Sequence, residues 1–217
     1  VREASGISEG DKLLTFSKIR AASQIMANLP YVKGVRIGIK LPDTVNIMIE
    51  EESVVYAIKS SDGQWWMMDS DGRVVEQANN AKAATATQVL GVTLEAPTVN
   101  EKGVATEMTP SETNELGELI PVSTTGAQRL TAALQILKAL ENNDIVGEAA
   151  SVDVTSTEDI ILWYGTRYQV NLGDTSRLDY KVDCMNDAIL QMSDYQSGVL
   201  DISFTIWPNQ VGYTPFA

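Results

Sequence analysis

This chain contains no histidine, so the most common general base in enzymes is missing. The side chains to consider for catalysis are its carboxylates and its single thiol. Glu50, Glu51 and Glu52 are adjacent, and paired carboxylates are a common basis for general acid–base catalysis. Consecutive residues of a strand point to opposite faces, so these side chains do not converge easily on one substrate. We therefore interpret them as the solvated end of a strand.

Two other motifs indicate chemistry that their surroundings do not support. Asp69-Ser70-Asp71-Gly72 resembles the start of a calcium loop, but its glycine comes too early and the expected bidentate glutamate is missing, so a tight turn is favoured. Cys184 lies beside the apolar face of a predicted helix, with no histidine to activate its thiol. Walker, dinucleotide-binding and serine-elbow motifs are not found. The sequence predicts no catalytic residue, no cofactor and no metal.

Composition narrows the class of protein further. A length of 217 residues is comfortable for two small units, and 44% hydrophobic residues suffice for a core. The formal net charge of −13 argues against nucleic acid and anionic lipid as partners. No apolar run approaches the roughly 20 residues that a membrane-spanning helix needs, and one cysteine excludes an internal disulfide.

A helix followed by a tight hairpin is predicted for residues 19–50. Apolar residues recur at spacings of three and four up to Leu29, which is typical of an amphipathic helix. Pro30 disfavours the helical conformation at Leu29, so the helix should end there. Two alternating runs follow, separated by the turn at residues 41–44. The order is helix, strand, turn, strand.

The rest of the chain reads as short strands, two helices and an acidic segment. The predicted strands are 53–58, 65–68, 89–94, 150–155, 160–164, 167–172 and 199–206, and the predicted helices are 126–142 and 175–192. Asp174 or Thr175 could cap the second helix. We expect a tether at residues 1–8, a first unit at 9–77 and a second unit at 78–217. Within the second unit, residues 96–125 are acidic and are expected to be a flexible loop.

The first unit resembles a POTRA domain, and specifically that of the FtsQ/DivIB family of bacterial cell-division proteins. The family pattern is a helix, then LP-aromatic-V-x-x-V, a strand, P-x-T/E-hydrophobic, a second strand, and an acidic end before a third strand. Residues 29–35, 41–45 and 50–56 match it in that order. The resemblance implies an α+β fold with short helices on a three-stranded sheet.

The second unit resembles the β domain that follows the POTRA domain in this family. The matching motifs are Val170-Asn171-Leu172-Gly173, the helix at 178–192 and Gly198-Val199-Leu200-Asp201-Ile202. The resemblance covers about residues 8–95 and 123–213 and implies an antiparallel-rich sheet with two helices. Two positions depart from the family pattern: Ser203, where many relatives have a basic residue, and Tyr213, where a tryptophan is common.

The resemblance implies a scaffold and not an enzyme. The chain would be the extracytoplasmic region of a single-pass cell-membrane protein at the division septum, anchored by an N-terminal helix outside this sequence. It would recruit FtsB/DivIC-type and FtsL-type partners, together with septal peptidoglycan synthases, and help regulate septal peptidoglycan synthesis. One alternative is a POTRA receptor or chaperone module of an outer-membrane assembly or secretion protein. A second is a secreted enzyme, which would need a deep pocket lined by convergent carboxylates.

The last predicted strand is the candidate partner-binding site. A strand at the edge of a sheet exposes unpaired backbone groups to which a partner strand can add. The residues expected to bind the partner are Leu200, Ile202, Phe204, Ile206 and Tyr213. Phe204 and Tyr213 match aromatic positions of the family and are expected to be the anchors. Phe204 also shares a face with Ile202, which leaves a core role open for it.

Overall fold

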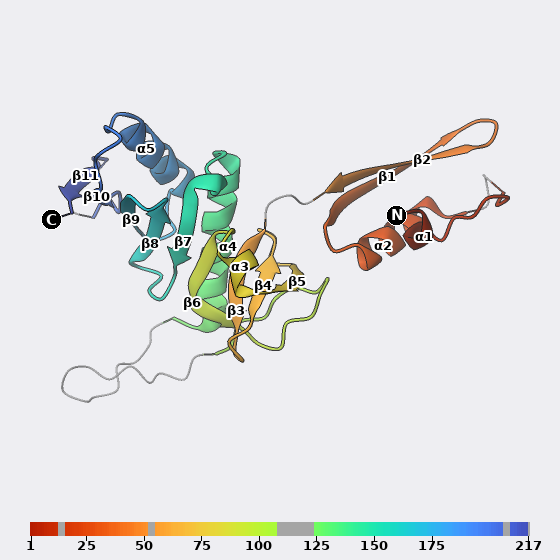
Figure 1. The fold of residues 1–217 in the computed structure, drawn as a ribbon, viewed down its shortest axis with the longest axis horizontal. Coiled ribbons are helices and arrows are strands. Elements are labelled where there is room, and N and C mark those ends of the chain that lie inside the picture. Colours follow the sequence, from red (N-terminus) through yellow and green to blue (C-terminus); the bar gives the residue numbers. More distant parts are fainter. Residues whose placement is uncertain (13–15, 52–54, 108–123, 206–208, 217) are drawn as a thin grey trace.

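The described residues of the computed structural model form a small N-terminal unit and a large mixed sheet with helices (Figure 1). They are residues 1–12, 16–51, 55–107, 124–205 and 209–216. The predicted α+β class, with a POTRA-like unit of helices and strands followed by a larger sheet, is confirmed.

The helices are α1 (Arg2–Ser5), α2 (Lys18–Asn28), α3 (Asn80–Ala83), α4 (Gly126–Asn142), η1 (Val146–Glu148) and α5 (Leu178–Leu190). The strands are β1 (Val32–Lys40), β2 (Thr44–Glu51), β3 (Tyr56–Ser60), β4 (Trp65–Met68), β5 (Val74–Ala78), β6 (Gln88–Leu94), β7 (Ala149–Asp153), β8 (Ile160–Tyr164), β9 (Tyr168–Gly173), β10 (Gly198–Asp201) and β11 (Gly212–Pro215).

The N-terminal unit follows the predicted helix and hairpin closely. The Ser17 side chain accepts a hydrogen bond from the Arg20 amide and caps α2, which buries Ala21 and Ile25. The helix ends at Asn28 because Leu29, before Pro30, is extended. The strands β1 and β2 pair antiparallel. Arg2–Ser5, expected within a tether, instead forms the short helix α1, which contacts α2.

The expected first unit of residues 9–77 is divided in the structure. Among the described residues β1 and β2 form a sheet of two strands instead of the expected three, whereas β3, β4 and β5 lie at one end of the nine-stranded sheet. Burial explains the difference: Tyr56, Ala57 and Ile58 are all fully buried, so both faces of β3 need cover. The hairpin, whose side chains are at most half-buried over most of its length, does not supply that cover.

The large sheet has the strand order β11-β10-β9-β8-β7-β6-β3-β4-β5. Five of its eight pairings are antiparallel, as predicted, and the pairs β3–β6, β6–β7 and β9–β10 are parallel. The helices α4 and α5 pack on each other and on one face, where the main core lies, and the short α3 helps to enclose a second, smaller core beside β3, β4 and β5 (Figure 1).

Three local expectations are wrong. The strand predicted for 199–206 ends at Asp201, and Phe204 adopts a left-handed conformation with φ 60°. Neither Asp174 nor Thr175 caps α5; Arg177 occupies that position without a side-chain cap bond. Residues 96–107, expected within a flexible loop, are held by backbone bonds such as Thr106 N–H to Thr93 O at 2.8 Å. Residues 108–123 and Ile206 lie outside the described residues.

Gly91 provides a test of the sheet. It lies where β6 slips its register against β3, has φ +81°, and a Cβ there would overlap the backbone nitrogen of Thr155. We expect Gly91→Ala to lower the free energy of unfolding by about 2–4 kcal/mol, because strain and overlap combine. Urea unfolding followed by tryptophan fluorescence measures it. Gly147→Ala is the matched control, since a Cβ there meets nothing within 4 Å; equal losses in both variants would contradict this account.

Candidate partner-binding edge

The strand β11 forms one end of the large sheet. It pairs antiparallel with β10 from Gly212 opposite Asp201 to Pro215 opposite Gly198. Just beyond the strand, the Phe216 amide donates to the Ser197 carbonyl at 3.1 Å, and the Phe216 ring stacks on Trp163 of β8. On its other side β11 pairs with no strand of the described part of the chain. It is therefore an edge strand.

The backbone groups that this edge presents follow from the ladder. In an antiparallel pair, successive residues point their N–H and C=O groups alternately toward and away from the partner strand. The bond from Phe216 to Ser197 places Phe216 on the inward set, and Thr214 with it. Tyr213 and Pro215 therefore point outward. The edge offers the N–H and C=O of Tyr213 and only the C=O of Pro215, since proline has no N–H.

Gly198 allows β11 to lie this close. A Cβ at Gly198 would overlap the carbonyl oxygen of Thr214 and come within 2.8 Å of the Tyr213 ring. The Tyr213 hydroxyl donates to the Ser197 carbonyl at 3.1 Å, so the ring lies along β10. The aromatic side chain is thus fixed beside the outward-facing backbone groups.

The structure separates the five residues expected to bind the partner. Leu200 and Ile202 are fully buried in the main core, so the expectation that they contact a partner is corrected. They lie inside because β10 is flanked on both sides, by β9 and β11, and α5 contacts the neighbouring strand β9. Phe204 and Tyr213 are partly buried against that core and partly accessible.

A cation–aromatic cluster surrounds Phe204. Its ring lies 5.6 Å from the Tyr180 ring, and the Arg177 guanidinium stands 4.3 Å over Tyr180 and 5.7 Å from Phe204. Arg177 also donates to the Asn209 side chain at 3.0 Å. Sequence reasoning missed Arg177 and Tyr180 because they reach Phe204 from another element. The only local signal was an aromatic residue off the apolar stripe of α5.

The opposite edge of the sheet is covered at the start of β5. Along the start of β5, Asn100 N–H donates to Val74 O and Val74 N–H donates to Glu101 O, both at 2.8 Å. Gly103 N–H also donates to Gly72 O at 2.8 Å. The segment after β6 thus occupies this edge as a strand would, which leaves β11 as the more accessible end.

A buried lysine orders the chain between β9 and α5. Lys181 is 1% exposed, and its ammonium group donates to the carbonyls of Leu172 and Asp174 and to the Asp174 carboxylate, each at 2.8 Å. All three of its donors are therefore used. Hydrogen bonds from Lys181 and then Ser176 lower the pKa of Asp174 to about 2.

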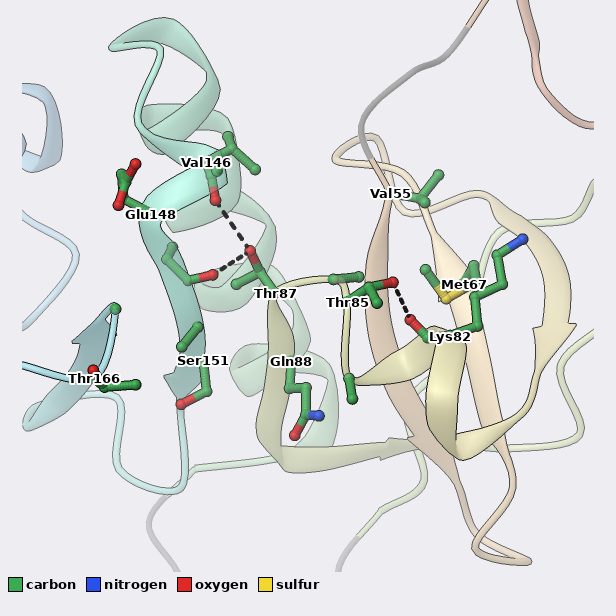
Figure 2. Close-up of a pocket in the computed structure, with 16 residues that line it drawn as sticks. Val55, Met67, Lys82, Thr85, Thr87, Gln88, Val146, Glu148, Ser151 and Thr166 are labelled. Carbon is green, nitrogen blue, oxygen red and sulfur yellow. Dashed lines mark hydrogen bonds between the residues drawn. The ribbon is translucent and has the colours of Figure 1, made fainter.

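A wide groove beside β6 and β7 does not resemble a catalytic site. It has a volume of about 740 Å³, with Lys82 near one end (Figure 2). Glu148 is the only carboxylate among the 16 residues that line it. The Thr87 hydroxyl donates to the Ala149 carbonyl at 2.7 Å, and the Thr85 hydroxyl to the Lys82 carbonyl at 2.8 Å. The groove thus lacks the convergent carboxylates that a secreted enzyme would need.

The other residues singled out for chemistry have structural surroundings. The Asp69 carboxylate accepts from the amides of Asp71 and Arg73, as expected of a tight turn. Glu50 and Glu51 are exposed on β2, Cys184 is half-buried, and Glu52 lies outside the described residues. In the part of the chain that the structure describes, no group of three His, Cys, Asp or Glu could hold a metal, and no helix could cross a membrane.

Known proteins resemble this chain over both units. A family model, the FtsQ-type POTRA domain, matches residues 1–52. The chain is 24% identical over 205 residues to the cell division protein DivIB of Clostridium tetani, covering 93% of this chain and 69% of that protein. It is 29% identical over 92 residues to DivIB of Clostridium acetobutylicum, covering 42% and 36%. It is 35% identical over 75 residues to FtsQ of Corynebacterium glutamicum, covering 35% and 33%.

The contact between Lys181 and Asp174 predicts an acid-dependent stability. A carboxylate with a lowered pKa stabilises the fold above its ordinary pKa of 3.8, and this contribution is lost as the pH falls through about 2. Since the Asp174 side chain is 57% exposed, we expect Asp174→Asn to cost only about 1 kcal/mol at pH 7. The difference from wild type should vanish near pH 2, measured by urea unfolding.

The exposed Asp187 on α5 supplies the control for this experiment. Asp187→Asn should change the free energy of unfolding by less than about 0.5 kcal/mol at either pH, because surface substitutions of this kind are usually near neutral. A loss in Asp174→Asn that persists unchanged at low pH would show that the carboxylate charge is not its cause.

Proposed function

The chain belongs to the FtsQ/DivIB family of cell-division proteins, with an FtsQ-type POTRA domain, and from this membership we propose that it is the extracytoplasmic region of a single-pass division scaffold. In this proposal it binds FtsB/DivIC-type and FtsL-type partners at the septum and has no catalytic role of its own. By holding these partners near septal synthases, it helps to regulate septal peptidoglycan synthesis.

The observation that carries the proposal is the accessible edge of β11. A partner segment in extended conformation can add to this edge as a further strand, through the outward N–H and C=O of Tyr213 and the C=O of Pro215. Main-chain bonds of this kind supply affinity for any extended segment. The Tyr213 ring and the cluster around Phe204 supply side-chain contacts that select among partners.

The bonds that already occupy the start of β5, at the opposite edge, support β11 as the edge to which a partner strand adds. At the start of β5, Val74 already accepts a backbone bond from Asn100 and donates one to Glu101, and just before the strand Gly72 accepts one from Gly103. A partner strand would have to displace these bonds there, whereas β11 requires no displacement among the described residues. The groove in Figure 2 favours no second function, because the hydroxyls of Thr85 and Thr87 are bonded to backbone carbonyls and its charges do not converge.

A binding experiment with a backbone variant tests this proposal. We expect Tyr213→Pro to weaken binding of an FtsB/DivIC-type ectodomain from the same genome by about five- to tenfold more than Tyr213→Ala does. Both variants lose the ring, but only proline also removes the outward N–H, and one such bond is worth about 1–1.5 kcal/mol. Isothermal titration calorimetry measures the difference. Removal of residues 212–217 should abolish binding.

Folding must be shown to survive these changes. Thermal unfolding followed by circular dichroism should give similar midpoints for the two Tyr213 variants, because the inward bonds of Thr214 and Phe216 remain. Equal affinities for Tyr213→Pro and Tyr213→Ala would rule out strand addition at this edge. No binding by the wild-type chain at high micromolar concentration would return the secretion-type POTRA receptor as the better candidate.

A further inference from the structure

The end of α2 and the start of β1 contact the β5 end of the large sheet. Three groups of the N-terminal unit take part: the Ala27 carbonyl, the Tyr31 side chain and the Val32 carbonyl. Their partners are Arg73 just before β5, Glu76 of β5, Lys82 of α3, and Asn100 of the segment after β6. The direct connection between the two units passes through residues 52–54, which lie outside the described residues.

Tyr31 makes the central contact. Its hydroxyl donates to Glu76 of β5 at 2.7 Å, and the Lys82 ammonium group, which pairs with Glu76, donates to the same hydroxyl at 3.3 Å. The ring packs against the small core of Ala57, Met67, Val75, Ala78 and Ala83. Burial and the bond to Glu76 raise the pKa of Tyr31, so the hydroxyl keeps the proton it donates.

The large sheet also caps the C-terminal end of α2. The last four carbonyls of a helix lack partners within it, and the Asn100 side chain donates to one of them, the Ala27 carbonyl, at 2.6 Å. Both terminal nitrogens of Arg73 approach the Val32 carbonyl, at 3.4 and 3.5 Å. Arg73 is held in place by the buried Asp69 carboxylate at 3.1 Å.

We propose that these contacts form an interdomain latch, with Tyr31 as its positioning residue, that holds the N-terminal unit in one orientation on the large sheet. Domains joined by small polar interfaces usually move relative to each other. Here the bonds are directional and converge on the six residues from Ala27 to Val32, so they fix rotation as well as distance. The latch goes beyond the proposed partner binding and does not depend on it.

The consequence is a fixed spacing between two distant surfaces. The hairpin of β1 and β2 lies at one end of the molecule, and β11 lies at the other (Figure 1). With the latch closed, the relative position of the two is set by the protein itself. A partner assembly that touches both surfaces would then bind without the loss of conformational entropy that ordering two mobile units requires.

Pulsed electron–electron double resonance, which measures the distance between two spin labels, tests the latch directly. Spin labels are attached through Met48→Cys on β2 and Leu190→Cys on α5, which are 59% and 75% exposed, in a Cys184→Ser background. The latched protein should give one narrow distance distribution. Tyr31→Ala should broaden it about twofold or more, because free domain motion is then restored.

Milder variants keep the experiment decisive if Tyr31→Ala folds poorly. Tyr31→Phe keeps the packed ring and loses the bond to Glu76, and Glu76→Gln loses the charge that pairs with Lys82. Both should broaden the distribution less than Tyr31→Ala does. Glu9→Gln is the matched control for Glu76→Gln: it removes an exposed ion pair with Arg2 that lies wholly within the N-terminal unit, and it should leave the distribution unchanged.

Two outcomes would overturn the inference. One is a broad distribution for the labelled protein that carries no latch substitution. The other is a distribution that stays narrow in Tyr31→Ala while circular dichroism shows a folded protein. Neither outcome bears on strand addition at β11, which the binding experiment tests separately.

Discussion

The structure depends on the burial of one face of α4 against the middle of the large sheet. Ile136, Leu137 and Leu140 are fully buried, and each such side chain contributes about 1.5–3 kcal/mol. The helix is also tied to β3, because the Tyr56 hydroxyl donates to Glu141 at 2.8 Å. This packing draws β3 away from the hairpin that precedes it in sequence. With β3 inside the large sheet, the two ends of that sheet are β5 and β11.

The sequence predicted those parts of the fold that arise from local patterns. The end of α2 before Pro30, the hairpin of β1 and β2, and the range of α4 were all confirmed, because periodicity and proline act over a few residues. The assignment of β3 to the first unit failed because its apolar run is equally compatible with either sheet. Only long-range burial decides between them, and periodicity does not report it.

The sequence predicted a sheet edge in the C-terminal segment, and partner binding at that edge stays a prediction. The C-terminal segment was expected to form the edge, and the edge is β11, beyond the strand that was expected to bind. The alternation from Leu200 onward could not show that Phe204 has a positive φ, or that its ring meets Arg177 and Tyr180. Lys181 likewise gave no signal, since a lysine on a helix is normally solvated.

Pro215 has a consequence for the behaviour of the protein at high concentration. An accessible edge strand can template the pairing of further copies, which leads to aggregation. Here the prolyl residue leaves one outward donor on β11, so a second copy laid along it would leave carbonyl groups without partners. The same residue that limits the length of an added strand therefore protects the sheet from uncontrolled growth.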